Sequence, residues 1–216
     1  MQERIAKETM LKKIRQSLIT KTDPHYPSLD WEKSVYALAE GASLEEQFAI
    51  AFKKIGGQFT FCENELDCVE EIIKLAEAKK WKQFYCWERP LQELLKQVEI
   101  PFTEEKEKFP EGMVGLTTCE ALVARLGNVI VSSAIGSGRR LFVAPTYHLI
   151  IARTSQVVPD LKDAFMLIRE KYDNKIPSMI ASLAGPSRTA DIEKTLVTPA
   201  HGPEEIHVFL IDDPSN

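Results

Sequence analysis

The stretch Ser43–Trp87, SLEEQFAIAFKKIGGQFTFCENELDCVEEIIKLAEAKKWKQFYCW, decides the fold class of this chain. A capping-box pattern at Ser43 predicts a helix whose apolar residues recur at helical spacing until paired glycines end it. Residues 58–62 then alternate like a strand, Asn64 can cap a second helix, and residues 83–87 form a short apolar strand. Helices and strands that alternate at such short spacing predict an α/β fold with a mostly parallel sheet flanked by helices.

The region before this stretch defines the domain organisation. Residues 1–20 predict an amphipathic helix with apolar residues spaced among lysines and arginines. Residues 20–42 predict an irregular connection, because its prolines break helices and bias the preceding residues toward extended conformations. We therefore predict an N-terminal helix and connection over residues 1–42 and one α/β domain over residues 43–213.

The second half of the domain predicts further elements of both kinds. A capping-box pattern at Thr117–Glu120 predicts a short helix that ends near Arg125, and Pro159-Asp160 predicts a helix that ends near Tyr172. Gly136-Ser-Gly138 predicts a turn. Apolar runs predict strands at residues 129–134, 141–144, 148–152, 178–184 and 206–212, and the last run is apolar enough to lie inside the sheet.

The composition excludes several function classes. A formal net charge of −5 argues against a protein that coats nucleic acid. The first residues are too charged for a secretory signal, and no apolar run is long enough to span a membrane, so we expect a cytoplasmic protein. The four cysteines form no CxxC pair and fit neither a zinc site nor an iron–sulfur ligand set. We therefore expect no metal and no redox cofactor in this chain.

The span Met113–Arg153 holds the first candidate site. It contains four arginines, no lysine and a single acidic residue, Glu120. The planar guanidinium suits bidentate binding of a carboxylate or phosphate better than an ammonium does. Residues 136–140, GSGRR, add a loop whose backbone N–H groups can face an anion. The alternative is a hairpin turn with two solvated arginines.

Two further clusters follow the apolar run at residues 178–184, one of them before the last strand and the other on both sides of it. Residues 185–193, GPSRTADIE, offer small residues and hydroxyls before a predicted helix start, where unpaired N–H groups favour an anion. The alternative is a simple helix cap with Arg188 paired to an acid. His201 lies in a Gly/Pro loop and Asp212 ends the last strand, at the edge where parallel sheets bind ligands. The alternative for His201 is a purely structural hydrogen bond.

Several motifs together resemble the lactate-utilisation protein C family, whose domain is called LUD. The motifs occur in the family order and read GLTTCEALVA at 115–124, SQVVPDL at 155–161, GPSRTADIE at 185–193, HGP at 201–203 and HVFLID at 207–212. The resemblance implies a Rossmann-like fold similar to that of sugar-phosphate isomerases and coenzyme A transferases. It also implies a role in bacterial growth on L-lactate, beside iron–sulfur partner subunits that oxidise lactate to pyruvate.

The chain departs from the family at one segment. Where relatives commonly read Ala-Glu-Thr-Gly-Thr, this sequence has Ala124-Arg125-Leu126-Gly127-Asn128. A carboxylate is thus replaced by a guanidinium, and the departure predicts a more cationic pocket than in those relatives.

These observations predict an accessory, non-redox subunit that binds a small carboxylate or phosphate at the carboxyl ends of the strands. The alternatives are a stand-alone enzyme acting on a sugar phosphate or an acyl-coenzyme A, and a regulatory or scaffolding protein with a vestigial pocket. The predicted ligand-binding residues are Thr118, Glu120, Gly136, Ser137, Gly138, Arg139, Arg140, Ser187, Arg188, Thr189, His201 and Asp212.

Overall fold

The computed structural model describes residues 2–19, 41–187, 189–190, 196–197 and 202–213. The chain divides into two units, Met1–Ala37 and Leu38–Asn216, and each is considered by itself. The first unit contains α1 (Gln2–Ile19), which confirms the helix predicted over residues 1–20. Every side chain of α1 whose burial is described is exposed to solvent. The predicted domain boundary at residue 42 remains a prediction.

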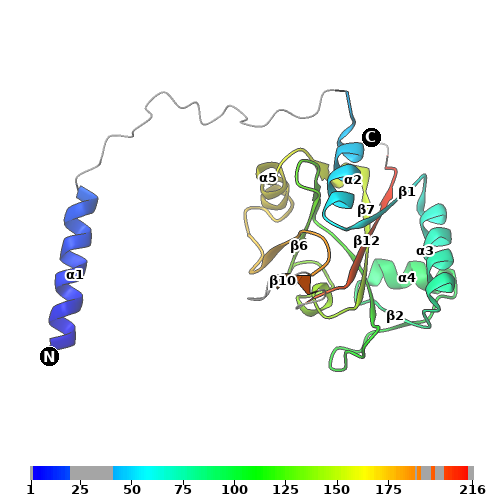
Figure 1. Cartoon of the computed structure of the whole chain (residues 1–216), viewed down its shortest axis with the longest axis horizontal. Helices are drawn as coiled ribbons and strands as arrows, with labels where there is room; N and C mark the ends of the chain where they lie inside the picture. The colour runs from blue at the N-terminus through cyan, green and yellow to red at the C-terminus, as the bar shows by residue number, and fades with distance from the viewer. Residues whose placement is uncertain (1, 20–40, 188, 191–195, 198–201, 214–216) are drawn as a thin grey trace. The chain divides into compact units, whose positions relative to one another are not determined.

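The second unit is built on a six-stranded sheet in which every strand pairing is parallel (Figure 1). This confirms the predicted mostly parallel sheet. β12 lies between β1 and β7, so the last strand is interior, as its apolar sequence predicts. In spatial order the strands are β1 (Gln58–Cys62), β12 (Glu205–Ile211), β7 (Tyr147–Arg153), β4 (Val114–Thr118), β2 (Phe84–Tyr85) and β3 (Phe102–Thr103).

Helices cover both faces of this sheet. α2 (Leu44–Lys54) begins with the predicted capping box at Ser43, and its buried Phe48 and Phe52 pack on one face. α3 (Glu65–Lys79), capped by Asn64, and α4 (Arg89–Gln97) pack on the other face. Along β12, Val208 and Leu210 belong to the α2 side, whereas Phe209 and Ile211 belong to the α3 side. This alternation along the strand explains why its sequence is continuously apolar.

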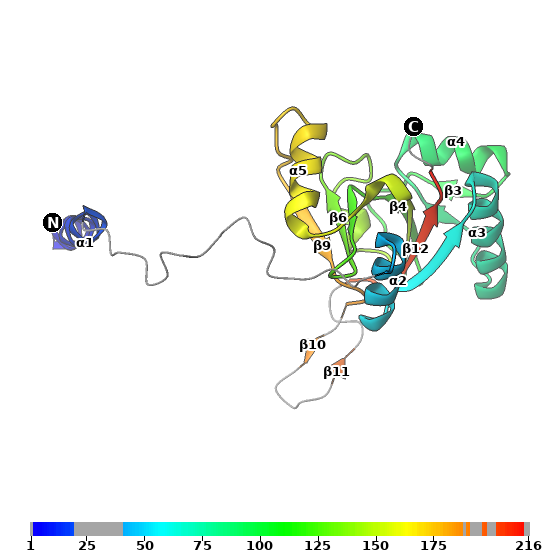
Figure 2. The same ribbon diagram turned by 90° about the horizontal axis from the view of Figure 1, so that it is seen from above.

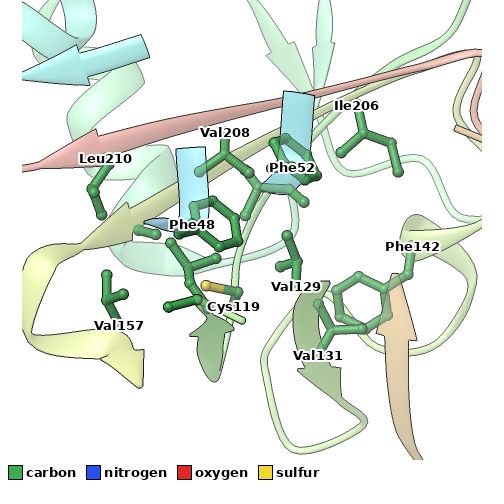
Figure 3. Packing of buried hydrophobic residues seen from close by; sticks show 14 of the residues in the cluster. Phe48, Phe52, Cys119, Val129, Val131, Phe142, Val157, Ile206, Val208 and Leu210 are labelled. Atoms are coloured by element: carbon green, nitrogen blue, oxygen red, sulfur yellow. The ribbon is translucent and has the colours of Figure 1, made fainter. Parts of the chain in front are cut away.

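A second, smaller sheet packs on the α2 side of the first. Its order is β8 (Val157–Val158), β5 (Ala121–Val123), β6 (Asn128–Ser132) and β9 (Ile180–Leu183). One face contributes Val129 and Val131 to the cluster around Phe48 and Phe52 (Figure 3). α5 (Leu161–Lys171), capped by Asp160 as predicted, covers the opposite face. A separate two-stranded piece pairs β10 (Thr189–Ala190) with β11 (Leu196–Val197).

Two local predictions are wrong. The Thr117–Glu120 pattern starts no helix; it joins β4 to β5, because Leu122 packs into one core cluster while Ala121 and Val123 pack into another. Such alternation between two buried faces requires a strand. Residues 141–144 form no strand, since the 3-10 helix Arg140–Phe142 begins this segment. The helix predicted to begin after Thr189 has its first turn at Asp191 and Glu193, which lie outside the described residues. A second 3-10 helix spans Thr154–Gln156.

Candidate functional site

A pocket of about 330 Å³ opens at the carboxyl edge of the main sheet. Parallel α/β sheets characteristically bind ligands outside this edge. In Figure 2 the tip of β12 and helix α4 lie at this end of the domain. We call it the Arg153–Lys171 pocket; its lining residues are Glu65, Pro90, Leu91, Leu94, Thr118, Cys119, Ile151, Arg153, Gln156, Lys171 and Ile211.

Arg153 is the first of two cations in this pocket. It ends β7, and its guanidinium donates to the carboxylate of Glu65, the first residue of α3. The side chain of Arg153 is 46% exposed and that of Glu65 is 55% exposed. An ion pair this exposed contributes little net stability, so an incoming anion can compete with Glu65 for the guanidinium.

Lys171 is the second cation, and a buried carboxylate holds it in place. Its Nζ lies 2.7 Å from Oε2 of Glu120, whose side chain is fully buried. Oε1 of Glu120 accepts from the hydroxyls of Ser132 and Tyr172. Burial works against the charge of Lys171, but the hydrogen bond and charge of Glu120 raise its pKa above the ordinary value. Lys171 therefore stays protonated at neutral pH, and the bond to Glu120 occupies one of its three N–H donors.

Thr118 and the 136–140 loop are linked by a residue that the sequence did not single out, Glu88. One carboxylate oxygen of Glu88 accepts from the backbone N–H of Thr118 at 2.8 Å and from the Ser137 hydroxyl. The other accepts from the Thr118 hydroxyl at 2.5 Å. Gly136 packs directly against Glu88, where a Cβ would lie 3.3 Å from its side chain. The Glu88 carboxylate thus accepts the hydrogen bonds of Thr118 and Ser137 that we predicted for a bound ligand.

The two loop arginines point to separate partners. Arg139 donates to the Ser178 hydroxyl at 2.8 Å, and Arg140 donates to the Lys106 carbonyl at 3.0 Å. The Arg140 guanidinium also lies 4.4 Å from the centre of the Phe109 ring. Gly138 adopts a positive φ of 67° beside Trp87. These contacts favour a structural role for Arg139 and Arg140 over the binding of an anion by this part of the loop.

The predicted residues on either side of β12 lie at opposite ends of the sheet. The Ser187 N–H donates to the carbonyl of Pro203, which precedes β12, whereas Asp212 follows it. The seven residues of β12 separate these ends by about 20 Å. Figure 2 shows β10, which contains Thr189, at the end opposite α4. Arg188 and His201 fall outside the described residues, as does the Thr189 side chain.

Asp212 belongs to a different, acidic pocket. This pocket of about 600 Å³ is also lined by Glu45, Glu46 and Asp213, together with Phe59 and Phe61. Its carboxylates disfavour an anion.

Two of the predicted residues belong to the Arg153–Lys171 pocket. Thr118 lines this pocket, and Glu120 lies behind it and holds Lys171 in place.

Arg125 adds no cation to the Arg153–Lys171 pocket, contrary to the expectation from the departing segment. It donates to both carboxylate oxygens of Asp160, from Nε at 3.0 Å and from the terminal nitrogen at 2.7 Å. Asp160 is the N-cap of α5. The substituted arginine thus connects the start of α5 to the β5–β6 turn.

The ion pair between Arg125 and Asp160 is expected to make a pH-dependent contribution to the stability of the fold. The hydrogen bond from Arg125 lowers the pKa of Asp160 below its ordinary value. A lowered pKa stabilises the fold above the unfolded-state pKa of about 4, and the stabilisation is lost as pH falls through the folded-state pKa. Arg125→Met is expected to lower the free energy of unfolding by up to about 1 kcal/mol at neutral pH and by less near pH ~3. Urea denaturation at both pH values measures this, and an equal loss at both would contradict it.

Sequence reasoning missed both cations of the pocket. Arg153 is one of the four arginines between Met113 and Arg153, and its position at the end of an apolar strand is the signal that could have identified it. Lys171 carried no signal, because its role depends on Glu120, which is 51 residues away. Cys119 also lines the pocket, where burial and the neighbouring carboxylates of Glu120 and Glu88 raise its pKa, so it remains a protonated thiol.

Metal binding and membrane insertion are two further classes of function. Within the described ranges, no group of three or more His, Cys, Asp or Glu side chains is arranged to hold a metal ion. None of the described helices combines the length and apolar character that crossing a membrane requires.

Comparison with known proteins identifies the family. Residues 45–211 match the family model of the LUD domain. The chain is 35% identical over 112 residues to lactate utilization protein C of Bacillus subtilis, covering 51% of this chain and 47% of the relative. For lactate utilization protein C of Bacillus licheniformis the identity is 32%, with the same coverage. The chain thus spans about half the length of these curated relatives.

A solved structure shows the same fold. The crystal structure of a DUF162 family protein from Deinococcus radiodurans aligns with a TM-score of 0.56 at 16% identity, covering 78% of this chain and 96% of that one. The match of the family model to most of the α/β unit, together with these relatives, shows that this chain belongs to the LUD domain family.

Proposed function

We propose that this chain is a component of a bacterial lactate-utilisation system that binds a small carboxylate or phosphate in the Arg153–Lys171 pocket. The observation that carries the proposal is the placement of two cations, from the ends of β7 and α5, in one pocket at the carboxyl edge of the sheet. The names of the relatives from Bacillus support the lactate-utilisation system.

The two cations have complementary tasks in this proposal. Lys171, fixed by Glu120, offers its remaining N–H donors at a defined position. Arg153 exchanges Glu65 for the ligand and binds it through two parallel hydrogen bonds. The Gln156 side chain, which donates to the Cys119 carbonyl at 2.6 Å, stiffens the wall between them. The chain contributes anion binding, and iron–sulfur partner subunits carry out the oxidation of L-lactate to pyruvate.

Arg153→Gln tests the site directly. The substitution removes a charged donor without removing buried volume, so the fold is expected to persist. Affinity for the bound anion is expected to fall about 10- to 100-fold, the equivalent of about 1.5–3 kcal/mol for hydrogen bonds to a charged group. Isothermal titration calorimetry with L-lactate, pyruvate and inorganic phosphate measures the change.

Two variants control this experiment. Arg139→Gln removes an exposed guanidinium from the 136–140 loop and is expected to leave affinity unchanged. Glu65→Gln removes the competing carboxylate and is expected to tighten binding about 2- to 5-fold. Binding that is lost in Arg139→Gln and retained in Arg153→Gln would move the site to the loop and overturn the proposal.

The two alternative functions predict different results for the purified chain. Turnover of a sugar phosphate or an acyl-coenzyme A by the purified chain would favour the stand-alone enzyme. Failure to bind any of the three anions, together with stable co-purification of a partner, would favour the scaffolding role.

A further inference from the structure

The Arg153–Lys171 pocket has an apolar floor that a small anion does not use. Pro90, Leu91 and Leu94 line it from α4, and Ile151 and Ile211 line it from β7 and β12. Leu91, Ile151 and Ile211 belong to one buried hydrophobic cluster, and Leu94 packs against it. The floor is therefore the outer layer of the rigid core, and its shape is fixed before any ligand binds.

The pocket is also larger than a small anion requires. Its volume of about 330 Å³ corresponds to about ten water molecules at about 30 Å³ each. A lactate or phosphate held between Arg153 and Lys171 would leave much of this space as water on an apolar surface. Volumes of this size occur in sites that enclose most of a larger organic ligand.

We propose that the pocket selects monocarboxylates that carry an unbranched aliphatic chain of about butyrate to hexanoate length. This inference rests on the proposed function, because it places the carboxylate at Arg153 and Lys171. The chain then lies along Leu91, Leu94 and Ile211 and displaces water from the floor. Each methylene group that leaves water is expected to raise affinity about fourfold until the floor is covered.

Calorimetric titration of the full chain with acetate, butyrate and hexanoate tests the selection. Hexanoate is expected to bind about 100-fold more tightly than acetate. This factor is smaller than complete burial of the added methylene groups would give, because the pocket buries them only in part. Leu94→Ala is expected to reduce hexanoate affinity about 10-fold and acetate affinity less than 2-fold. Arg153→Gln is expected to weaken both ligands by the same factor, because it acts on the shared carboxylate.

Leu75→Ala is the matched control for the floor. Leu75 is half-buried on α3 and packs against the same cluster as Leu94, but it does not line the pocket. Equal loss of hexanoate affinity in both leucine variants would show a general loss of stability and overturn the inference. Equal affinity of the wild-type chain for acetate and hexanoate would overturn the chain-length selection alone. Binding of none of the three carboxylates, lactate or phosphate would overturn the proposed function as well.

Discussion

Replacing Lys171 with Met is expected to lower the free energy of unfolding by about 2–4 kcal/mol. Glu120 has a fully buried side chain, and Lys171 is the cation bonded to it. Removing one partner of a buried pair costs about 3–5 kcal/mol, because the other charge stays buried without compensation. The loss is smaller here, since Lys171 is 48% exposed and already partly hydrated. Urea denaturation at neutral pH measures it.

Two further variants isolate the cause. Lys162→Met changes an exposed lysine on the same helix and is expected to alter stability by less than about 0.5 kcal/mol. Combining Glu120→Gln with Lys171→Met removes the buried charge, keeps an amide that can bond Ser132 and Tyr172, and is expected to recover most of the loss. If the double variant is no more stable than Lys171→Met, the buried charge is not the cause.

Gly127→Ala is expected to destabilise the chain by about 2–5 kcal/mol. Gly127 has a φ of +66°, and an added Cβ would lie 2.4 Å from the backbone nitrogen of Phe52. Left-handed backbone costs a non-glycine residue about 1–2 kcal/mol, and overpacking against a helix backbone adds about 1–3 kcal/mol. The turn between β5 and β6 would have to move away from α2, which carries Phe48 and Phe52 into the core. Urea denaturation followed by circular dichroism measures the change.

Gly112→Ala separates the two causes. Gly112 also has a positive φ, +76°, but an added Cβ would meet nothing within 4 Å. This control carries the conformational cost alone and is expected to lose about 1–2 kcal/mol. Equal losses at the two positions would show that Gly127 does not touch α2 closely.

The fold class could be predicted from the sequence because its signals are local. The capping box at Ser43 and the cap at Asn64 lie within a few residues of the helices they start, and each strand between them shows its own apolar pattern. One of the two failures of these local signals, at Thr117–Glu120, has the same origin. A capping-box pattern specifies only local hydrogen bonds, whereas Ala121 and Leu122 occupy two different buried clusters that the pattern cannot show.

The candidate site depended on contacts between distant residues. The sequence alone determined an α/β domain of the LUD family type and an excess of arginine between Met113 and Arg153. Only the tertiary structure decided that Arg125 pairs with Asp160, and that Glu120 holds Lys171 in the pocket with Arg153. The physical reason is that a charge is neutralised by whichever opposite charge the fold brings within a few ångströms, and chain separation does not specify that distance.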